Sequence, residues 1–260
     1  MIKLTEDMIN IWSILAHNIG SVDGVAGLMG NLYAESACRA DNLQNNYAKR
    51  LGMTDAEYTK AVNDRKYTDF ATDHAGYGLA QWTAKARKQN MYGFAACCGT
   101  SIGDPVMQSI FMVLELQNYS IVNNILKTAD SVYDAAYAVL RMYEKPANVT
   151  SEKASKRAQY GRDIMNALED VRFYTTVLDE KTTTVPEYHV LRRGAKGDEV
   201  QHFQHQLMAL GYRLPKYGAD GKYGKETADA VRTFQSHCKL YADGIAGSVT
   251  QYCVAKCALD

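Results

Sequence analysis

Glu35 stands at the edge of an apolar helical face, a position that suits a carboxyl group for acid chemistry. At about 100° per residue, five apolar side chains of residues 25–33 span an arc of about 140°, and Glu35 falls about 20° outside it. Partial desolvation disfavours the charged form of a carboxyl group, so we expect Glu35 to stay protonated near neutral pH. A protonated Glu can serve as the general acid that cleaves a glycosidic bond. The five apolar residues are Val25, Leu28, Met29, Leu32 and Tyr33.

Three glycines lie on the other faces of the same predicted helix, at Gly24, Gly27 and Gly30. Glycine lowers helix propensity, but its missing side chain lets neighbouring elements approach the backbone closely. We therefore expect a central helix whose last turn carries the candidate acid.

A second motif lies at residues 76–83, which read Gly-Tyr-Gly-Leu-Ala-Gln-Trp-Thr and are followed by basic residues. A third motif, Tyr-Glu-Lys-Pro, occupies residues 143–146. Together with Glu35-Ser36, these motifs resemble the Glu-Ser and Gly-Leu-x-Gln motifs of goose-type lysozymes and lytic transglycosylases. The lysozyme-like domain of phage tail lysozymes and endolysins is more similar still. The resemblance covers about residues 5–168.

The resemblance implies that Glu35 is the catalytic acid of a muramidase, which cleaves the β-1,4 bond between N-acetylmuramic acid and N-acetylglucosamine in bacterial peptidoglycan. Ser36 would orient the end of the helix or Glu35 itself. Gln81 would line the saccharide cleft through hydrogen bonds, and Trp82 through stacking. For Trp82 and Tyr143, packing in the core is the alternative role. The residues expected to bind substrate or support the acid are Ser36, Tyr77, Gln81, Trp82, Tyr143 and Glu144.

Hydrolysis of a glycosidic bond requires a second carboxylate, whether the enzyme retains or inverts the configuration of the sugar. Asp73, three residues before the 76–83 motif, is the predicted base, and its rivals are Asp64, Asp69 and Glu144. Transglycosylases of the related fold work with one Glu, because a substituent of the sugar assists. Lytic transglycosylase activity on the same bond therefore stays an alternative.

The C-terminal region repeats one short pattern. Asp-Gly-x-x-Gly-x-x-Thr occurs at residues 220–227 and again 23 residues later at 243–250, and a looser copy begins at Gly194. A repeat of short period indicates one supersecondary unit used several times. Here the unit is a glycine turn followed by apolar residues at helical spacing. The sequence therefore predicts short helices that each begin after a glycine turn.

This repeat resembles the common peptidoglycan-binding domain, a small three-helix module. The resemblance also includes Leu191-Arg192-Arg193-Gly194 and the Phe-Gln pairs at residues 203–204 and 234–235. It covers essentially residues 189–260 and places many motif positions in the right order. It implies that bacterial peptidoglycan is the partner of this region.

The whole chain is expected to be mainly α, with a lysozyme-like helical domain, a linker and the three-helix module. Residues 40–75 form a polar excursion within the first domain. Helix starts are indicated by the capping pattern Thr54-x-x-Glu57 and by Asp104-Pro105. A Thr-rich, proline-terminated segment marks the linker. The predicted parts are residues 1–170 (catalytic domain), 171–188 (linker) and 189–260 (peptidoglycan-binding domain).

The formal net charge of the 260 residues is zero, which argues against a nucleic-acid partner. No apolar run reaches the length that crosses a membrane, and the first residues do not read as a signal peptide. Phage lysis enzymes wait in the host cytoplasm and escape through holes made by a partner protein. We therefore expect a monomer that stays in the host bacterial cytoplasm until a holin releases it to the cell wall.

A zinc amidase or endopeptidase is the first competing function. Such an enzyme needs several His or Cys ligands, but residues 1–170 contain only two histidines, His17 and His74. His202 and His205 in the C-terminal region are expected to decorate helices. We therefore expect neither a metal nor another cofactor.

A cysteine hydrolase and an inactive lysozyme fold complete the alternatives. A Cys-His enzyme needs an activated thiol, yet no family signature surrounds Cys38. All six cysteines are expected to be reduced thiols. An inactive fold that only binds the wall is disfavoured, because Glu35 and Gln81 occur together.

Overall fold

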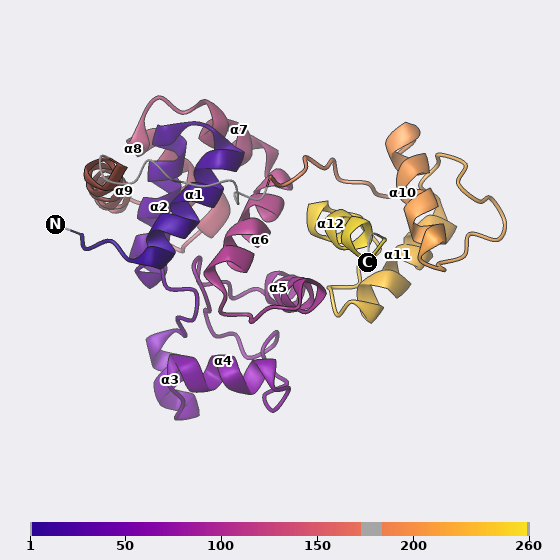
Figure 1. Ribbon diagram of the computed structural model, residues 1–260, viewed down its shortest axis with the longest axis horizontal. Coiled ribbons are helices and arrows are strands. Elements are labelled where there is room, and N and C mark those ends of the chain that lie inside the picture. The colour runs from indigo at the N-terminus through magenta and orange to yellow at the C-terminus, as the bar shows by residue number, and fades with distance from the viewer. Residues whose placement is uncertain (1, 173–183, 259–260) are drawn as a thin grey trace. The chain divides into compact units, whose positions relative to one another are not determined.

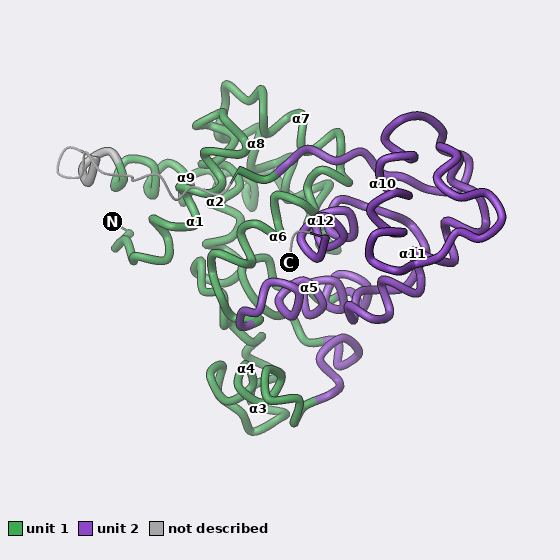
Figure 2. Tube along the Cα trace, turned by 45° about the vertical axis from the view of Figure 1, so that its right-hand side comes forward, with its two compact units in different colours: residues 1–67, 75–83, 102–185 green, residues 68–74, 84–101, 186–260 purple. Residues whose placement is uncertain are grey.

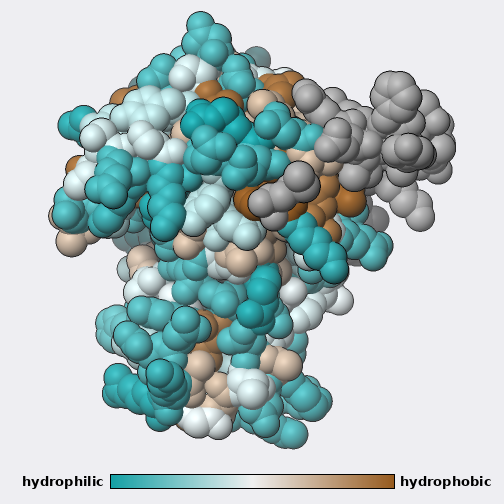
Figure 3. Space-filling model, turned by 90° about the vertical axis from the view of Figure 1, so that its left-hand side faces the viewer, coloured by the Kyte–Doolittle hydropathy of each residue, from teal (hydrophilic) through white to brown (hydrophobic). Residues whose placement is uncertain are grey.

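The computed structural model describes residues 2–172 and 184–258 and confirms a mainly α fold. The chain forms two compact units, which are coloured in Figure 2. None of the described helices is long and apolar enough to cross a membrane. The face drawn in Figure 3 is mainly hydrophilic, with small hydrophobic areas between polar side chains.

The first unit contains most of the region that resembles lysozymes and comprises residues 1–67, 75–83 and 102–185. Figure 1 labels its α-helices. Its only β structure among the described residues consists of isolated bridges around the 76–83 motif. Its helices are α1 (Glu6–Ile19), α2 (Val22–Ser36), α3 (Asn45–Leu51), α4 (Asp55–Asn63), α6 (Pro105–Gln117), α7 (Ser120–Thr128), α8 (Val132–Ala138), the π-helix η1 (Val139–Glu144) and α9 (Ser151–Arg172).

Helix α2 is central in the first unit, as its glycines predict. A Cβ added to Gly24 would lie 1.9 Å from the carbonyl oxygen of Leu126, and one added to Gly30 would lie 1.9 Å from that of Arg157. A Cβ added to Gly27 would lie 2.5 Å from the Cβ of Ala135 and 2.7 Å from the backbone nitrogen of Ala136, both in α8. Because these glycines carry no side chain, α2 packs closely on the backbones of α7, α8 and α9.

Local capping groups start the predicted helices. Thr54 and Glu57 form a capping box at the start of α4. The side chain of Asp104 accepts a hydrogen bond from the backbone N–H of Met107 at the start of α6, and Pro105 occupies the first turn. Both sequence predictions of helix starts are therefore confirmed.

The 76–83 motif forms a tight loop held on α6. Backbone hydrogen bonds join Tyr77 and Trp82 in both directions, at 3.2 and 3.0 Å. Gly78 adopts a positive φ of 77°, and the side-chain amide of Gln108 would lie 2.6 Å from any Cβ added there. Gln108 also accepts a hydrogen bond from the backbone N–H of Leu79. Glycine is therefore needed where the loop turns against α6.

The second unit comprises residues 68–74, 84–101 and 186–260. Its helix α5 packs on α12, with the rings of Phe94 and Tyr252 5.4 Å apart. Two segments of the predicted catalytic region thus cluster with the predicted binding module. The middle of the predicted linker, residues 173–183, lies outside the described residues. The helices of this unit are α5 (Lys85–Cys98), α10 (Asp198–Ala209), α11 (Lys225–His237) and α12 (Ser248–Cys257).

The glycine turns start helices as predicted, because α10, α11 and α12 begin directly after Gly197, Gly224 and Gly247. Gly221 and Gly244, the second residues of the two repeated patterns, have positive φ angles of 72° and 74°. Such angles are readily adopted only by glycine.

A buried glutamine makes equivalent hydrogen bonds with each copy of the repeat. The Nε2 group of Gln204 donates to Asp220, Lys222 and Thr227 of the first copy. The Nε2 group of Gln235 makes the equivalent bonds with the second copy, which are to Asp243, Ile245 and Thr250. The Phe-Gln pairs and the glycine patterns are therefore parts of one structural unit.

Candidate active site

Glu35 occupies the last turn of α2. The helix ends because Ala37 adopts a left-handed conformation, with φ 53°. The hydroxyl of Ser36 donates to the carbonyl oxygen of Leu79 at 2.8 Å and to that of Leu32 at 3.1 Å. Ser36 therefore fastens the end of α2 to the 76–83 loop, and its orienting role in catalysis stays a prediction.

Arg157 of α9 joins two carboxylates. Its Nη2 group donates to Oε1 of Glu35 at 2.5 Å and to Oε2 of Glu144 at 3.2 Å. Glu144 is the last residue of η1, and the chain then reverses at Lys145, which has a φ of 52°. The side chain of Glu35 is 28% exposed and that of Glu144 is 7% exposed. The cluster is thus buried on the side of Glu144 and open on the side of Glu35.

Burial and, less strongly, the nearby negative charge of Glu35 raise the pKa of Glu144 from its ordinary value of 4.5 to about 7. Arg157 opposes both effects. Glu144 Oε1 is buried with no hydrogen-bond partner among the described residues. A proton on this carboxyl group removes the cost of burying a charge. The cluster can therefore hold a proton near neutral pH.

Residues 6–168 match the phage tail lysozyme family, and residues 196–253 match the peptidoglycan binding domain family. The chain belongs to the phage tail lysozyme family. The combination confirms the predicted order of a lysozyme-like segment followed by a wall-binding segment, and it is that of a cell-wall lytic enzyme.

Curated relatives share short stretches with this chain. The N-acetylmuramoyl-L-alanine amidase CwlL of Bacillus licheniformis is 44% identical over 66 residues, which are 25% of this chain and 18% of the relative. The spore cortex-lytic enzyme of Bacillus subtilis (strain 168) is 38% identical over 78 residues, which are 30% of this chain and 25% of the relative. The chain therefore spans a quarter or less of these relatives' lengths. No solved structure matches the chain.

Trp82 and Tyr143 meet at a buried carboxylate. The indole N–H of Trp82 donates to Glu115 Oε2 at 3.0 Å, and the hydroxyl of Tyr143 donates to the same oxygen. Trp82 has no exposed surface and packs edge-on against Phe111. The predicted stacking of Trp82 on a sugar does not fit this position, because its ring has no accessible face. The core-packing alternative describes both aromatic residues in this structure.

Tyr77 and Gln81 stabilise the 76–83 loop. The hydroxyl of Tyr77, a fully buried residue, lies 2.6 Å from that of Thr59. The Nε2 group of Gln81 donates to the carbonyl oxygens of Asn42 and Gly78. Tyr77 is thus placed in the core, and Gln81 is half-buried at the loop.

Asp73 belongs to the second unit and forms a buried ion pair. The Nζ group of Lys88 donates to Asp73 Oδ1 at 2.5 Å, and both side chains are at most 5% exposed. The Lys88 ammonium also lies 4.5 Å from the centre of the Phe70 ring. Of the rival carboxylates, Asp64 pairs with surface lysines. Only Glu144 among these candidates shares a hydrogen-bond donor with Glu35 in the described residues.

Sequence reasoning missed Arg157 and Glu115. Glu115 is a single carboxylate within the apolar run of α6, and that isolation is a signal of a buried, partnered acid. Arg157 lies between Ala154 and Ala158, which are fully buried, on a helix that is otherwise mostly polar. No group of three or more His, Cys, Asp or Glu side chains that could hold a metal ion occurs in the described part of the chain.

Proposed function

We propose that this chain cleaves the glycan strands of bacterial peptidoglycan at the β-1,4 bond between N-acetylmuramic acid and N-acetylglucosamine, with Glu35 as the general acid. The cluster in which Arg157 bridges Glu35 and Glu144 carries the proposal. Membership of the phage tail lysozyme family supports this bond. The match at residues 196–253 supports peptidoglycan as the polymer that is bound.

The carboxyl groups of Glu35 and Glu144 differ in solvent exposure. Glu35 is the more exposed of the two, so it is the one that can approach a sugar oxygen. Glu144 shares the Nη2 donor of Arg157 with Glu35 and has a pKa of about 7, so it can keep a proton close to the acid. Two interacting carboxyl groups titrate as a pair. In this account Glu144 keeps a proton near neutral pH, and Glu35 is the group that transfers a proton to the leaving oxygen.

The spacing of the pair bears on the stereochemistry. Both carboxylates contact the same nitrogen of Arg157. Their contacting oxygens are therefore closer than the roughly 6.5–9.5 Å that inverting enzymes use to hold a water between two carboxyl groups. This proximity leaves no room between the two carboxylates for the attacking water of an inverting enzyme.

A lytic transglycosylase is the second candidate, and one observation favours it. Glu35 is the exposed carboxylate of the cluster, whereas Glu144 is buried and Asp73 is tied to Lys88. An enzyme with a single accessible carboxylate suits a reaction in which the sugar supplies its own nucleophile. The products would then be 1,6-anhydro sugars instead of reducing sugars.

An amidase remains a competing proposal because CwlL is named as one. Its alignment of 66 residues is far shorter than the 6–168 segment that contains the Glu35 cluster. Because the alignment covers only 18% of CwlL, the name alone does not assign amide cleavage to that cluster. Residence in the host cytoplasm, release through a holin and a monomeric state stay predictions from the phage-enzyme resemblance.

Digestion of purified peptidoglycan followed by mass spectrometry tests the proposed function. A muramidase releases reducing ends without free amino groups, and a transglycosylase releases anhydro ends. Release of free amino groups with intact glycan strands would overturn both candidates in favour of an amidase or endopeptidase.

A further inference from the structure

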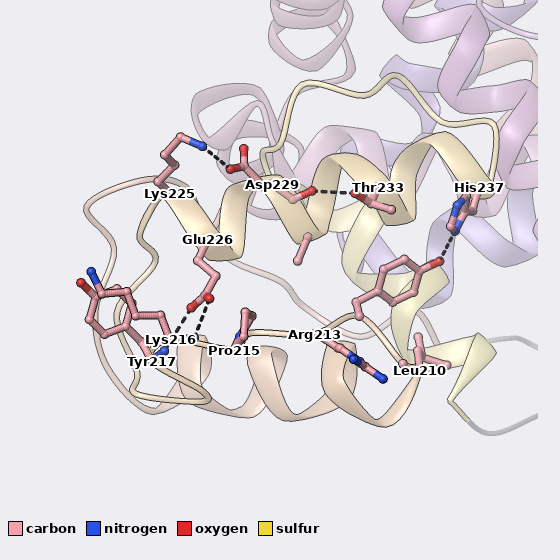
Figure 4. Close-up of a pocket in the computed structure, with 13 residues that line it drawn as sticks. Leu210, Arg213, Pro215, Lys216, Tyr217, Lys225, Glu226, Asp229, Thr233 and His237 are labelled. Carbon is pink, nitrogen blue, oxygen red and sulfur yellow. Dashed lines mark hydrogen bonds and ion pairs between the residues drawn. The ribbon is translucent and has the colours of Figure 1, made fainter.

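A groove of ≈ 810 Å³ lies in the second unit, between α11 and the loop that follows α10 (Figure 4). One wall is a row of α11 side chains spaced four residues apart: Lys225, Asp229, Thr233 and His237. The opposite wall is the loop of residues 210–217. The groove therefore combines a fixed helical wall with a loop whose side chains are largely exposed.

Hydrogen bonds hold this loop to α11 at two points. Near the start of the helix, the carboxylate of Glu226 accepts the backbone N–H groups of Lys216 and Tyr217 at 2.9 and 3.2 Å. Near its end, the hydroxyl of Tyr212 lies 2.9 Å from Nδ1 of His237. The groove between these two points is therefore preformed, which lowers the entropy cost of binding a ligand.

The charges of the groove favour an anion. Its two carboxylates are already engaged, because Glu226 holds the loop and Asp229 pairs with Lys225 at 2.6 Å and with Arg232 at 2.7 Å. Arg213 on the opposite wall is exposed and has no acidic partner among the described residues. An exposed guanidinium that is not paired with an acidic side chain can bind a carboxylate through two parallel hydrogen bonds.

Tyr217 adds an apolar face beside that charge. Its side chain is 59% exposed, and the Lys216 ammonium lies 4.9 Å from the centre of its ring. An exposed aromatic ring on a fixed loop can pack against methyl groups and peptide planes at low entropy cost. The groove thus matches a small, extended ligand that carries a carboxylate and short apolar side chains.

We propose that this groove binds the carboxylate-bearing stem peptide of peptidoglycan, with Arg213 on the carboxylate and Tyr217 against the peptide. The glycan strand itself is excluded as the preferred ligand, because the carboxyl groups of its substituted muramic acids are consumed in the amide bonds to the stems. The inference rests on the proposed function for its choice of polymer, but it concerns binding alone. It gives the second unit a preference for stem peptides with free carboxylates, whichever bond is cut elsewhere.

Titration of the full chain tests the proposal, with changes of NMR amide shifts as the readout. The probes are the free tetrapeptide L-Ala–D-γ-Glu–L-Lys–D-Ala, the same peptide with amidated carboxyl groups, and uncharged chitotetraose. The free peptide is expected to bind and to shift amides of residues 210–217 and of α11. Stronger or equal binding of the amidated peptide or of chitotetraose would overturn the proposal.

Arg213→Gln supplies the matched variant, and Arg193→Gln, an exposed position of the same unit outside the groove, supplies the control. Loss of a charge-assisted hydrogen bond is expected to weaken peptide binding about tenfold in Arg213→Gln, whereas Arg193→Gln should bind as the wild type does. Equal affinities of Arg213→Gln and wild type would contradict the assignment. Because cleavage products are analysed separately, failure of the glycosidase proposal and failure of the peptide groove give different results.

Discussion

Glu35 and Glu144, which come from different helices, accept hydrogen bonds from the same nitrogen of Arg157. Glu35 lies in the last turn of α2 and Glu144 ends η1, and Arg157 of α9 joins them, so the packing of three helices creates the pair. Burial acts mainly on Glu144, and exposure is greater at Glu35. This asymmetry separates the place where a proton is kept from the place where it can be delivered.

Glu144 should make the protein less stable as pH rises from about 4.5 to about 7. Its pKa is raised from 4.5 to about 7 in the folded chain, so the folded state binds more protons than the unfolded state in that window. The stabilisation is fully present below pH 4.5 and is lost as pH rises through the raised pKa. The shift corresponds to a change on the order of 3 kcal/mol in the free energy of unfolding. For the wild type, urea unfolding should give a lower free energy of unfolding at pH 7.5 than at pH 4.5. This contribution to the difference should be absent in Glu144→Gln.

Arg157→Leu should raise the pKa of Glu144 further, because Arg157 lowers it in the wild type. Activity at neutral pH should fall by about tenfold or more, since removing one partner of a buried charge cluster also disturbs its geometry. The pH–rate profile is the decisive measurement, because its limb near pH 7 should move upward. Arg157→Lys keeps the positive charge but replaces the guanidinium with an ammonium group, so this limb of the profile should move less. A profile that does not move in Arg157→Leu would contradict the role given to the bridge.

Trp82→Phe should reduce stability and leave the Michaelis constant unchanged. The substitution removes buried volume and the hydrogen bond to Glu115, which together are worth about 2–4 kcal/mol. Tyr143→Phe, which removes only a hydroxyl, should cost about 1 kcal/mol. Thermal unfolding and steady-state kinetics on soluble glycan check both variants. A large rise in the Michaelis constant of Trp82→Phe would restore the sugar-stacking role.

Asp73→Asn should destabilise the protein by about 3–5 kcal/mol, because it leaves the buried Lys88 without its charged partner. The double variant Asp73→Asn/Lys88→Met should recover much of that loss, since neither buried group is then charged. If Asp73 has only this structural role, the double variant should also recover wall-cleaving activity. A folded but inactive double variant would instead support the prediction that Asp73 is the catalytic base.

The sequence predicted what local patterns specify. The helical spacing around Glu35 and its three glycines gave a central helix, and the helix starts at Thr54 and Asp104 follow from capping chemistry. The repeated glycine pattern gave the helices of the second unit. Its partner Gln204 could not be assigned a role, because the bonds it makes join segments on either side of a loop.

The residues that interact with Glu35 could not be predicted from local sequence patterns. Arg157 looks like one of many exposed charges on α9 until α2 and α9 pack through Gly30 and place it beside Glu35. Glu144 was only one of several possible second carboxylates, because its burial depends on the reversal after η1. Aromatic residues such as Trp82 occur both in binding clefts and in hydrophobic cores, so the motif alone does not distinguish the two. Long-range packing decided each of these cases.

The most direct test of the central claim compares Glu35→Gln with wild type on purified peptidoglycan, with thermal unfolding to establish that the variant is folded. The substitution keeps the size of the side chain and its ability to accept a hydrogen bond from Arg157, but removes the transferable proton. Release of glycan reducing or anhydro ends should fall by at least about 10²-fold. A folded Glu35→Gln protein that releases these ends at a near-normal rate would contradict the assignment of Glu35 as the acid.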